Sequence, residues 1–267
     1  MTPISVSQGS NPIVLGLPHT GIFVPDDVLA HLNNNGQKLA DTDWHIDRLY
    51  DGLLPDVTTV KANFHRYVID ANRDPKGGSL YPGQNTTTLV PLIDFDGLDI
   101  WKTPPTTAQI AQRCADFHAP YHEALRAELA RVRDLHGVVI LYDCHSIRSD
   151  ISYLFDGTLP DFNIGTNLGE TCATQIEAAT AAICTEAQDY STTINGRFKG
   201  GWTTRHYGQP QSGIHAIQME LAQSTYLTDE AAPWTYDQAK ADRLRPHLKN
   251  ILAIFGRFGP FFRRYPC

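Results

Sequence analysis

Short apolar runs alternate with longer amphipathic stretches along the chain, a pattern that predicts an α/β fold. Two short runs rich in Val, Ile and Leu, within residues 11–17 and 137–150, are typical of buried core strands, because each is bounded by turn or polar residues. Alternating apolar residues at 215–221 predict another core strand. Further short strands are expected at 57–62, 67–70 and 192–195, with more within 153–166.

The clearest helix is expected over residues 105–136, where apolar side chains recur at helical spacing. Pro120 should bend or divide this helix, because proline has no amide N–H to donate. His118 and His122 lie four residues apart on it, a spacing that can bind metal, but no H-E-x-x-H motif is present and we expect a structural or rim role. Shorter helices are predicted at 26–34, 41–51, 169–186 and 236–255.

These elements predict one α/β domain over residues 1–267, with a mixed, mostly parallel central sheet flanked by helices. The helix at 105–136 leads directly into the strand that starts at Gly137, as in a βαβ unit. We see no internal repeat or linker that would divide the chain.

Composition and charge narrow the class of protein. The hydrophobic content of 42% and charged content of 19% are ordinary for a globular enzyme, and a net charge of −7 argues against nucleic acid as a partner. No apolar run is long enough to span a membrane, and the polar stretch 1–11 does not have the design of a signal peptide. Five cysteines without paired spacing suit reduced thiols, so we expect a cytoplasmic protein. The oligomeric state is not visible, and a monomer is compatible with the sequence.

Two histidines follow core strands in similar contexts. His19 stands in P-H-T-G after the strand at 11–17, and His145 stands in D-C-H-S near the end of the strand at 137–150. Ligands of open α/β sheets bind at the carboxyl ends of strands. One such histidine is more often a loop or core residue than a ligand, whereas the pair makes the two interpretations about equal. Cys144 should point to the opposite face of its strand and pack in the core.

Asp43 and Asp47 are four residues apart and would share one helical face. They are interpreted either as a solvated acidic helix start or as oxygen ligands of a cation, with Asp47 the ligand and Asp43 an outer or alternative one. Arg66 and the pair Asn72–Arg73 offer planar donors to a carboxylate, although a structural salt bridge is equally compatible. The long loop at 77–107 predicts a lid or a substrate wall.

Together these side chains have the composition of a catalytic zinc site, which uses two imidazoles, one carboxylate and a position left for water. Glu220, near the end of the strand at 215–221, would take the proton of the water and return it to the leaving amine. Arg66 would stabilise the oxyanion, and Asn72 with Arg73 would hold a substrate carboxylate. This arrangement predicts a hydrolase that cuts an amide bond next to a carboxylate-bearing amino acid.

Seven motifs between Pro18 and Gln223 resemble those of the N-formylglutamate amidohydrolases, or deformylases, of histidine degradation, and the similarity covers nearly the whole chain. They are P-H-T-G at Pro18, D-T-D-W-H-I-D-R-L-Y at Asp41, R-Y-V-I-D-A-N-R at Arg66, L-Y-P-G-Q-N-T-T at Leu80, D-C-H-S-I-R-S at Asp143, N-G-R-F-K-G-G at Asn195 and M-E-L-A-Q at Met219. That family is similar in turn to the zinc carboxypeptidase and aspartoacylase group, which implies a fold of that kind.

The resemblance implies that His19 and His145 bind Zn²⁺ or another divalent transition metal and that Glu220 is the base. The H-x-x-E pattern of the carboxypeptidases is absent, because Ile22, Phe23 and Val24, three to five residues after His19, cannot bind a metal. Asp47 is therefore chosen as the third ligand over Asp43 and over His45, with Asp43 kept as an outer partner. Asp143 is expected to orient a ligand from outside.

The implied reaction is hydrolysis of N-formyl-L-glutamate to formate and L-glutamate. Because glutamate carries two carboxylates, Arg148, Lys199 and Arg205 are expected to join Arg73 in binding it. Three alternatives stay open: a metal-dependent deacylase that removes a succinyl or acetyl group, a non-catalytic protein that binds acidic amino acids, and a thiol hydrolase that uses Cys144.

Overall fold

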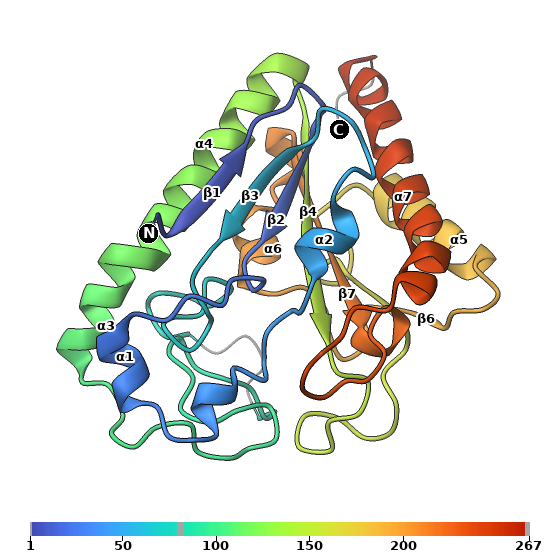
Figure 1. The fold of residues 1–267 in the computed structure, drawn as a ribbon. Coiled ribbons are helices and arrows are strands. Elements are labelled where there is room, and N and C mark those ends of the chain that lie inside the picture. The colour runs from blue at the N-terminus through green and yellow to red at the C-terminus, as the bar shows by residue number, and fades with distance from the viewer. Residues whose placement is uncertain (1, 79–82, 265–267) are drawn as a thin grey trace.

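A computed structural model describes residues 2–78 and 83–264, and these residues form one seven-stranded sheet with helices on both faces (Figure 1). The spatial order is β1-β3-β2-β4-β7-β5-β6. β3, β2, β4 and β7 run parallel to one another, whereas β1 and β5 pair antiparallel with their inner neighbours. The strands are β1 (Ile4–Ser7), β2 (Ile13–Leu17), β3 (Thr58–Ala62), β4 (Val139–Ile147), β5 (Phe162–Gly165), β6 (Thr192–Ile194) and β7 (Ile214–Ala222). The predicted mixed, mostly parallel α/β sheet is confirmed.

The helices cover both faces of this sheet, with α4 on one side and α5 and α7 on the other (Figure 1). Two large apolar clusters fill the spaces between the sheet and these helices. The helices are α1 (Asp26–His31), α2 (Ile46–Tyr50), α3 (Thr107–Arg113), α4 (Ala119–His136), α5 (Thr174–Glu186), α6 (Trp202–Tyr207) and α7 (Gln238–Arg264). Among the described residues, no helix is long and apolar enough to cross a membrane.

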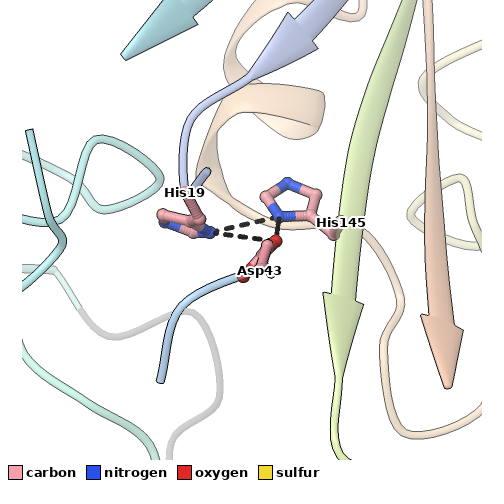
Figure 2. Close-up of side chains that lie close together, drawn as sticks. All are labelled: His19, Asp43 and His145. Carbon is pink, nitrogen blue, oxygen red and sulfur yellow. Dashed lines mark hydrogen bonds and ion pairs between the residues drawn. The ribbon is translucent and has the colours of Figure 1, made fainter. Parts of the chain in front are cut away.

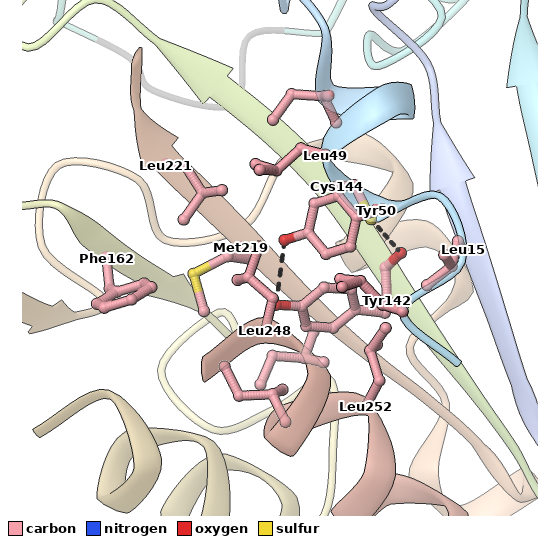
Figure 3. Packing of buried hydrophobic residues seen from close by; sticks show 14 of the residues in the cluster. Leu15, Leu49, Tyr50, Tyr142, Cys144, Phe162, Met219, Leu221, Leu248 and Leu252 are labelled. Atoms are coloured by element: carbon pink, nitrogen blue, oxygen red, sulfur yellow. Dashed lines mark hydrogen bonds between the residues drawn. The ribbon is translucent and has the colours of Figure 1, made fainter. Parts of the chain in front are cut away.

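The central strand β4 is buried along its whole length, so its alternate side chains enter both clusters. Tyr142 and Cys144 pack toward α7 in the first cluster, whereas Leu141 lies in the second (Figure 3). Each fully buried apolar side chain of this kind contributes about 1.5–3 kcal/mol through the area removed from water. The expected core position of Cys144 is confirmed, and burial raises the pKa of its thiol well above the usual value.

The predicted long helix is divided where Pro120 suggested. α3 begins with a capping box between Thr106 and Gln109, and a π-helical segment, Cys114–His118, joins it to α4. Proline at the second position of α4 cannot donate to the preceding turn, which favours the local widening. α4 ends at Gly137, whose φ of 76° is the left-handed conformation that glycine adopts without strain.

Some expected elements differ in the structure. Residues 67–70 form a turn and not a strand, and the helix expected at 41–51 is reduced to α2. The short edge strand β1 and the six-residue helix α6 were not predicted. Residues 80–82 of the L-Y-P-G-Q-N-T-T motif, together with Cys267, lie outside the described residues.

Candidate active site

The candidate site lies where the parallel strands end. β2 ends two residues before His19, and His145 lies near the carboxyl end of β4. In the β4–β7 ladder His145 is the register partner of Glu220, so the two side chains start side by side. Because β2, β4 and β7 are parallel neighbours, their carboxyl ends meet at one edge of the sheet. Topology therefore brings together three residues that are far apart in sequence.

His19, Asp43 and His145 form a buried cluster at this edge (Figure 2). The two Nδ1 atoms lie 3.2 Å apart, and Asp43 Oδ2 lies 3.7 Å from that of His19 and 3.2 Å from that of His145. All three side chains are at most 3% exposed. One ligand atom from each side chain thus faces a common point, and two imidazoles with one carboxylate are a donor set that suits a divalent metal such as zinc.

The outer nitrogens of both histidines are engaged by carboxylates. His19 Nε2 lies 2.7 Å from Asp70 Oδ1, and His145 Nε2 lies 3.2 Å from Asp143 Oδ1. A carboxylate accepts and does not donate, so the proton of neutral His19 belongs on Nε2. His145 Nε2 lies 3.2 Å from Asp143 Oδ1, an acceptor, and 3.2 Å from Asn72 Nδ2, a donor, so its tautomer depends on which of the two it pairs with. With both protons on Nε2, the two Nδ1 atoms present lone pairs toward each other and toward Asp43, and a cation between them relieves the repulsion. Pairing of the outer nitrogen with a carboxylate is the arrangement that orients metal-binding histidines.

The charges around the cluster also favour a cation. Burial opposes ionisation of Asp43, but Arg66, which donates to Asp43 Oδ1, holds the pKa of that carboxyl well below its usual value. Burial lowers the pKa of His145, yet Asp143 and Asp43 together raise it well above the usual value. Positive charge is therefore stabilised between these side chains, and a proton or a divalent metal can supply it.

Glu220 is held in one orientation at the edge of the cluster. Gln218 Nε2 donates to Glu220 Oε2 at 3.0 Å, and Gly201 N–H donates to Gln218 Oε1 at 2.6 Å. The Gly201 donor identifies the oxygen of the Gln218 amide, so its NH₂ group must face Glu220. Burial raises the pKa of Glu220 from 4.5 to about 8. A carboxyl group with a pKa near neutrality can both accept and return a proton.

A cavity opens onto this cluster. Three guanidinium groups line it, those of Arg66, Arg73 and Arg197, together with Phe198. The long loop contributes part of the wall, as predicted for residues 77–107, through Asn85, Thr86, Thr87 and Phe95. The cavity is lined further by His19, Asn72, His145, Gln218 and Glu220.

Asp47, which the sequence favoured as the third ligand, does not reach the histidines. Its side chain is 41% exposed and forms an ion pair with Lys61 at 3.0 Å. Asp43 takes the position instead, because α2 begins only at Ile46 and Asp43 lies in the turn before it. His45 Nε2 points elsewhere and lies 2.8 Å from Trp234 O. The choice of Asp47 over Asp43 is corrected on this geometry.

The structure places only some of the predicted substrate-binding residues in the cavity. Asn72 and Arg73 line the cavity, whereas Arg148, Lys199 and Arg205 are not among its described lining residues. Arg148 forms an ion pair with Asp96 at 2.9 Å, and Arg205 Nε donates to Gly200 O at 2.8 Å.

Three residues of the site were missed from the sequence: Asp70, Gln218 and Arg197. Asp70 opens the D-A-N-R motif, and Gln218 precedes Glu220 by two residues, which places both on one face of β7. The sequence spacing could therefore have indicated Gln218, and the motif could have indicated Asp70. For Arg197 the sequence offers no indication beyond its place in a basic, glycine-rich segment.

Comparisons with known proteins identify the family of the chain. The sequence model of the N-formylglutamate amidohydrolase family matches residues 11–227. N-formylglutamate deformylases from Pseudomonas aeruginosa and Pseudomonas putida are 43% and 42% identical to the chain, over 94% and 96% of it and 96% of each relative. These matches extend over almost the full length of both relatives.

Two solved structures share the fold. The crystal structure of N-formylglutamate amidohydrolase from Ralstonia eutropha JMP134 has a TM-score of 0.79 at 23% identity and covers 99% of both chains. A gene product of Agrobacterium tumefaciens has a TM-score of 0.71 at 16% identity and covers 96% of this chain and 95% of that one. Given the family match and the two relatives above 40% identity, the chain belongs to the N-formylglutamate amidohydrolase family.

Proposed function

We propose that the protein hydrolyses N-formyl-L-glutamate to formate and L-glutamate in a metal-dependent reaction. The observation that carries the proposal is the convergence of His19 Nδ1, Asp43 Oδ2 and His145 Nδ1 within 4.8 Å of one another, beside the buried Glu220. The printed names of the two Pseudomonas relatives support the same substrate. By the same resemblance, the reaction would belong to histidine degradation in the cytoplasm.

His19, Asp43 and His145 would hold the metal, for which Zn²⁺ is our first choice because the donor set is two imidazoles and one carboxylate. A divalent metal bound there acts as a Lewis acid on a carbonyl oxygen and lowers the pKa of a water molecule. Asp70 and Asp143 fix the orientation of the two imidazoles through Nε2. The donor geometry is thus held by side chains that need not touch the substrate.

Glu220 is proposed as the general base. It would accept a proton from the attacking water and deliver it to the nitrogen of the leaving amine. The Gln218 amide fixes one of its oxygens, so the other is left to face the cavity. Arg66, which lines the same cavity and is fixed by Asp43, would donate to the oxyanion that develops on the formyl carbonyl.

The substrate carries two carboxylates, and the cavity wall offers matching cations. We propose that Arg73 and Arg197 on the wall, with the Asn72 amide, bind them. The guanidinium of Arg73 is already oriented by Thr87, since Nε donates to its carbonyl and Nη2 to its hydroxyl, both at 2.9 Å. Direct contacts from Arg148, Lys199 or Arg205 would require these side chains to leave their present positions.

The proposal is tested with N-formyl-, N-acetyl- and N-succinyl-glutamate as substrates. The release of formate, acetate and succinate is measured side by side. We expect formyl-glutamate to be cleaved fastest, with activity lost on chelation and restored by Zn²⁺. Preferred cleavage of the acetyl or succinyl compound would identify a different deacylase. Activity that survives chelation but is lost on thiol alkylation would instead support the buried Cys144.

A further inference from the structure

Two histidines at the start of α4, His118 and His122, contact the backbone on either side of Asn72, which lines the candidate site. They were noted in the sequence for their four-residue spacing, and neither points toward the metal cluster. His118 Nε2 lies 3.0 Å from the carbonyl oxygen of Arg73, and His122 Nε2 lies 2.8 Å from that of Ala71. A carbonyl oxygen only accepts, so each ring donates from Nε2. Burial is the main cause that lowers the pKa of both side chains, that of His122 to about 3.

The two carbonyls flank Asn72, and Asn72 belongs to a turn that touches both metal-site histidines. Its side-chain Nδ2 lies 3.2 Å from His145 Nε2, and its backbone N–H donates to Asp70 Oδ1 at 2.8 Å. The same Asp70 oxygen is the partner of His19. A displacement of this one turn would therefore rotate both imidazoles away from their common point.

Helix α6 contacts the Asn72 side chain and the His122 ring. Thr203 N–H donates to Asn72 Oδ1 at 2.8 Å, and Gly201 lies so near that a Cβ atom there would stand 2.2 Å from Asn72 Nδ2. The Tyr207 hydroxyl lies 3.0 Å from His122 Nδ1, the remaining acceptor of that ring. The turn that carries Asn72 is thus held between α4, α6 and β4.

We propose that His118 and His122 are positioning residues, which fix the turn Asp70–Arg73 and through it the imidazoles of His19 and His145. The inference rests on the proposed metal-dependent function. The π-helical segment that ends at His118 supports it, because a local change of helix register is frequent where side chains must be aimed at a site. Loss of an outer partner of a metal ligand typically weakens metal binding 10–100-fold.

The test compares His122→Phe and His118→Phe with His122→Gln. Phenylalanine keeps a ring against Trp202 and Tyr207 but removes the donor, whereas the glutamine amide can still donate to Ala71 O. We measure the Zn²⁺ dissociation constant by competition with a chelator, kcat and KM for N-formylglutamate, and the unfolding temperature. We expect Zn²⁺ affinity to fall about 10-fold in each Phe variant, kcat to fall more than KM rises, and His122→Gln to restore both.

His206→Gln is the matched control, because His206 stacks on Trp202 in the same aromatic group but is exposed. It should keep the affinity of the unchanged protein. If His122→Phe does not fold, Tyr207→Phe, which removes only a hydroxyl, gives the milder version of the same change and should weaken Zn²⁺ binding in the same direction. Phe variants that unfold at lower temperature but bind Zn²⁺ with unchanged affinity would overturn the proposal. Failure of the unchanged protein to bind any divalent metal would overturn the proposed function itself.

Discussion

Replacing Glu220 with glutamine changes activity and stability in opposite directions. Glu220 is 7% exposed, and burial raises the pKa of its carboxyl group from 4.5 to about 8. The folded metal-free protein therefore binds this proton more tightly than the unfolded chain does. As the pH rises above 4.5, the unfolded chain ionises freely while the folded protein does not, so the folded state loses stability until the pH passes 8.

Each pKa unit corresponds to 1.36 kcal/mol. The penalty in the metal-free protein is below about 1 kcal/mol at pH 5 and roughly 3 kcal/mol at pH 7. Glu220→Gln removes it and can keep the hydrogen bond from Gln218. We therefore expect the metal-free variant to unfold at higher urea concentration at pH 7, with little gain at pH 5. Its rate of formate release should fall about 10²–10⁴-fold, because the general base is lost.

Glu123→Gln, a change at an exposed position of α4, is the control and should alter neither quantity. Urea titrations of the metal-free proteins at both pH values, with formate release from the metal-loaded ones, give the comparison. The reasoning is refuted if Glu220→Gln retains full turnover, or if its gain in stability is the same at pH 5 and pH 7.

Three further substitutions test the electrostatics of the site. Asp43→Asn should weaken Zn²⁺ binding at least 10-fold, whereas Asp47→Asn should leave it unchanged, and equal effects in a chelator competition would contradict the assignment of Asp43. Burial raises the pKa of Asp41 from 3.8 to about 7, so this group also costs stability as the pH rises from 3.8 toward 7. Asp41→Asn should raise the free energy of unfolding by roughly 4 kcal/mol at pH 7 and by little at pH 4; a gain independent of pH in urea titrations would be inconsistent with this.

The core of the fold was predictable because its strands are short apolar runs or, at 215–221, alternating apolar residues. Those that became β2, β4 and β7 were all located from hydrophobicity alone, and their parallel arrangement places their carboxyl ends together. Residues 67–70 gave the same signal but form a turn, since Asp70 N–H donates to Leu89 O in the long loop and not to a neighbouring strand. Long-range contacts of this kind leave no periodic trace in the sequence.

The sequence predicts those site residues that lie at the carboxyl ends of strands. His19, His145 and Glu220 were found in this way, whereas the third ligand was not. Helical spacing placed Asp43 and Asp47 on one face, but His45 has a φ of 59°, and this left-handed residue separates Asp43 from α2. The positions of Asp43, and of Arg197 on the far wall, depend on turns that only the folded chain defines.

If His19, Asp43 and His145 hold a metal on which deformylation depends, metal content and activity must change together. Elemental analysis and formate release from N-formylglutamate, measured on the same samples, decide this. We expect about one divalent metal per chain and activity in proportion to it, with His145→Ala losing both. Full activity in protein free of metal, or a stoichiometric metal that His145→Ala retains, would refute the proposed metal site.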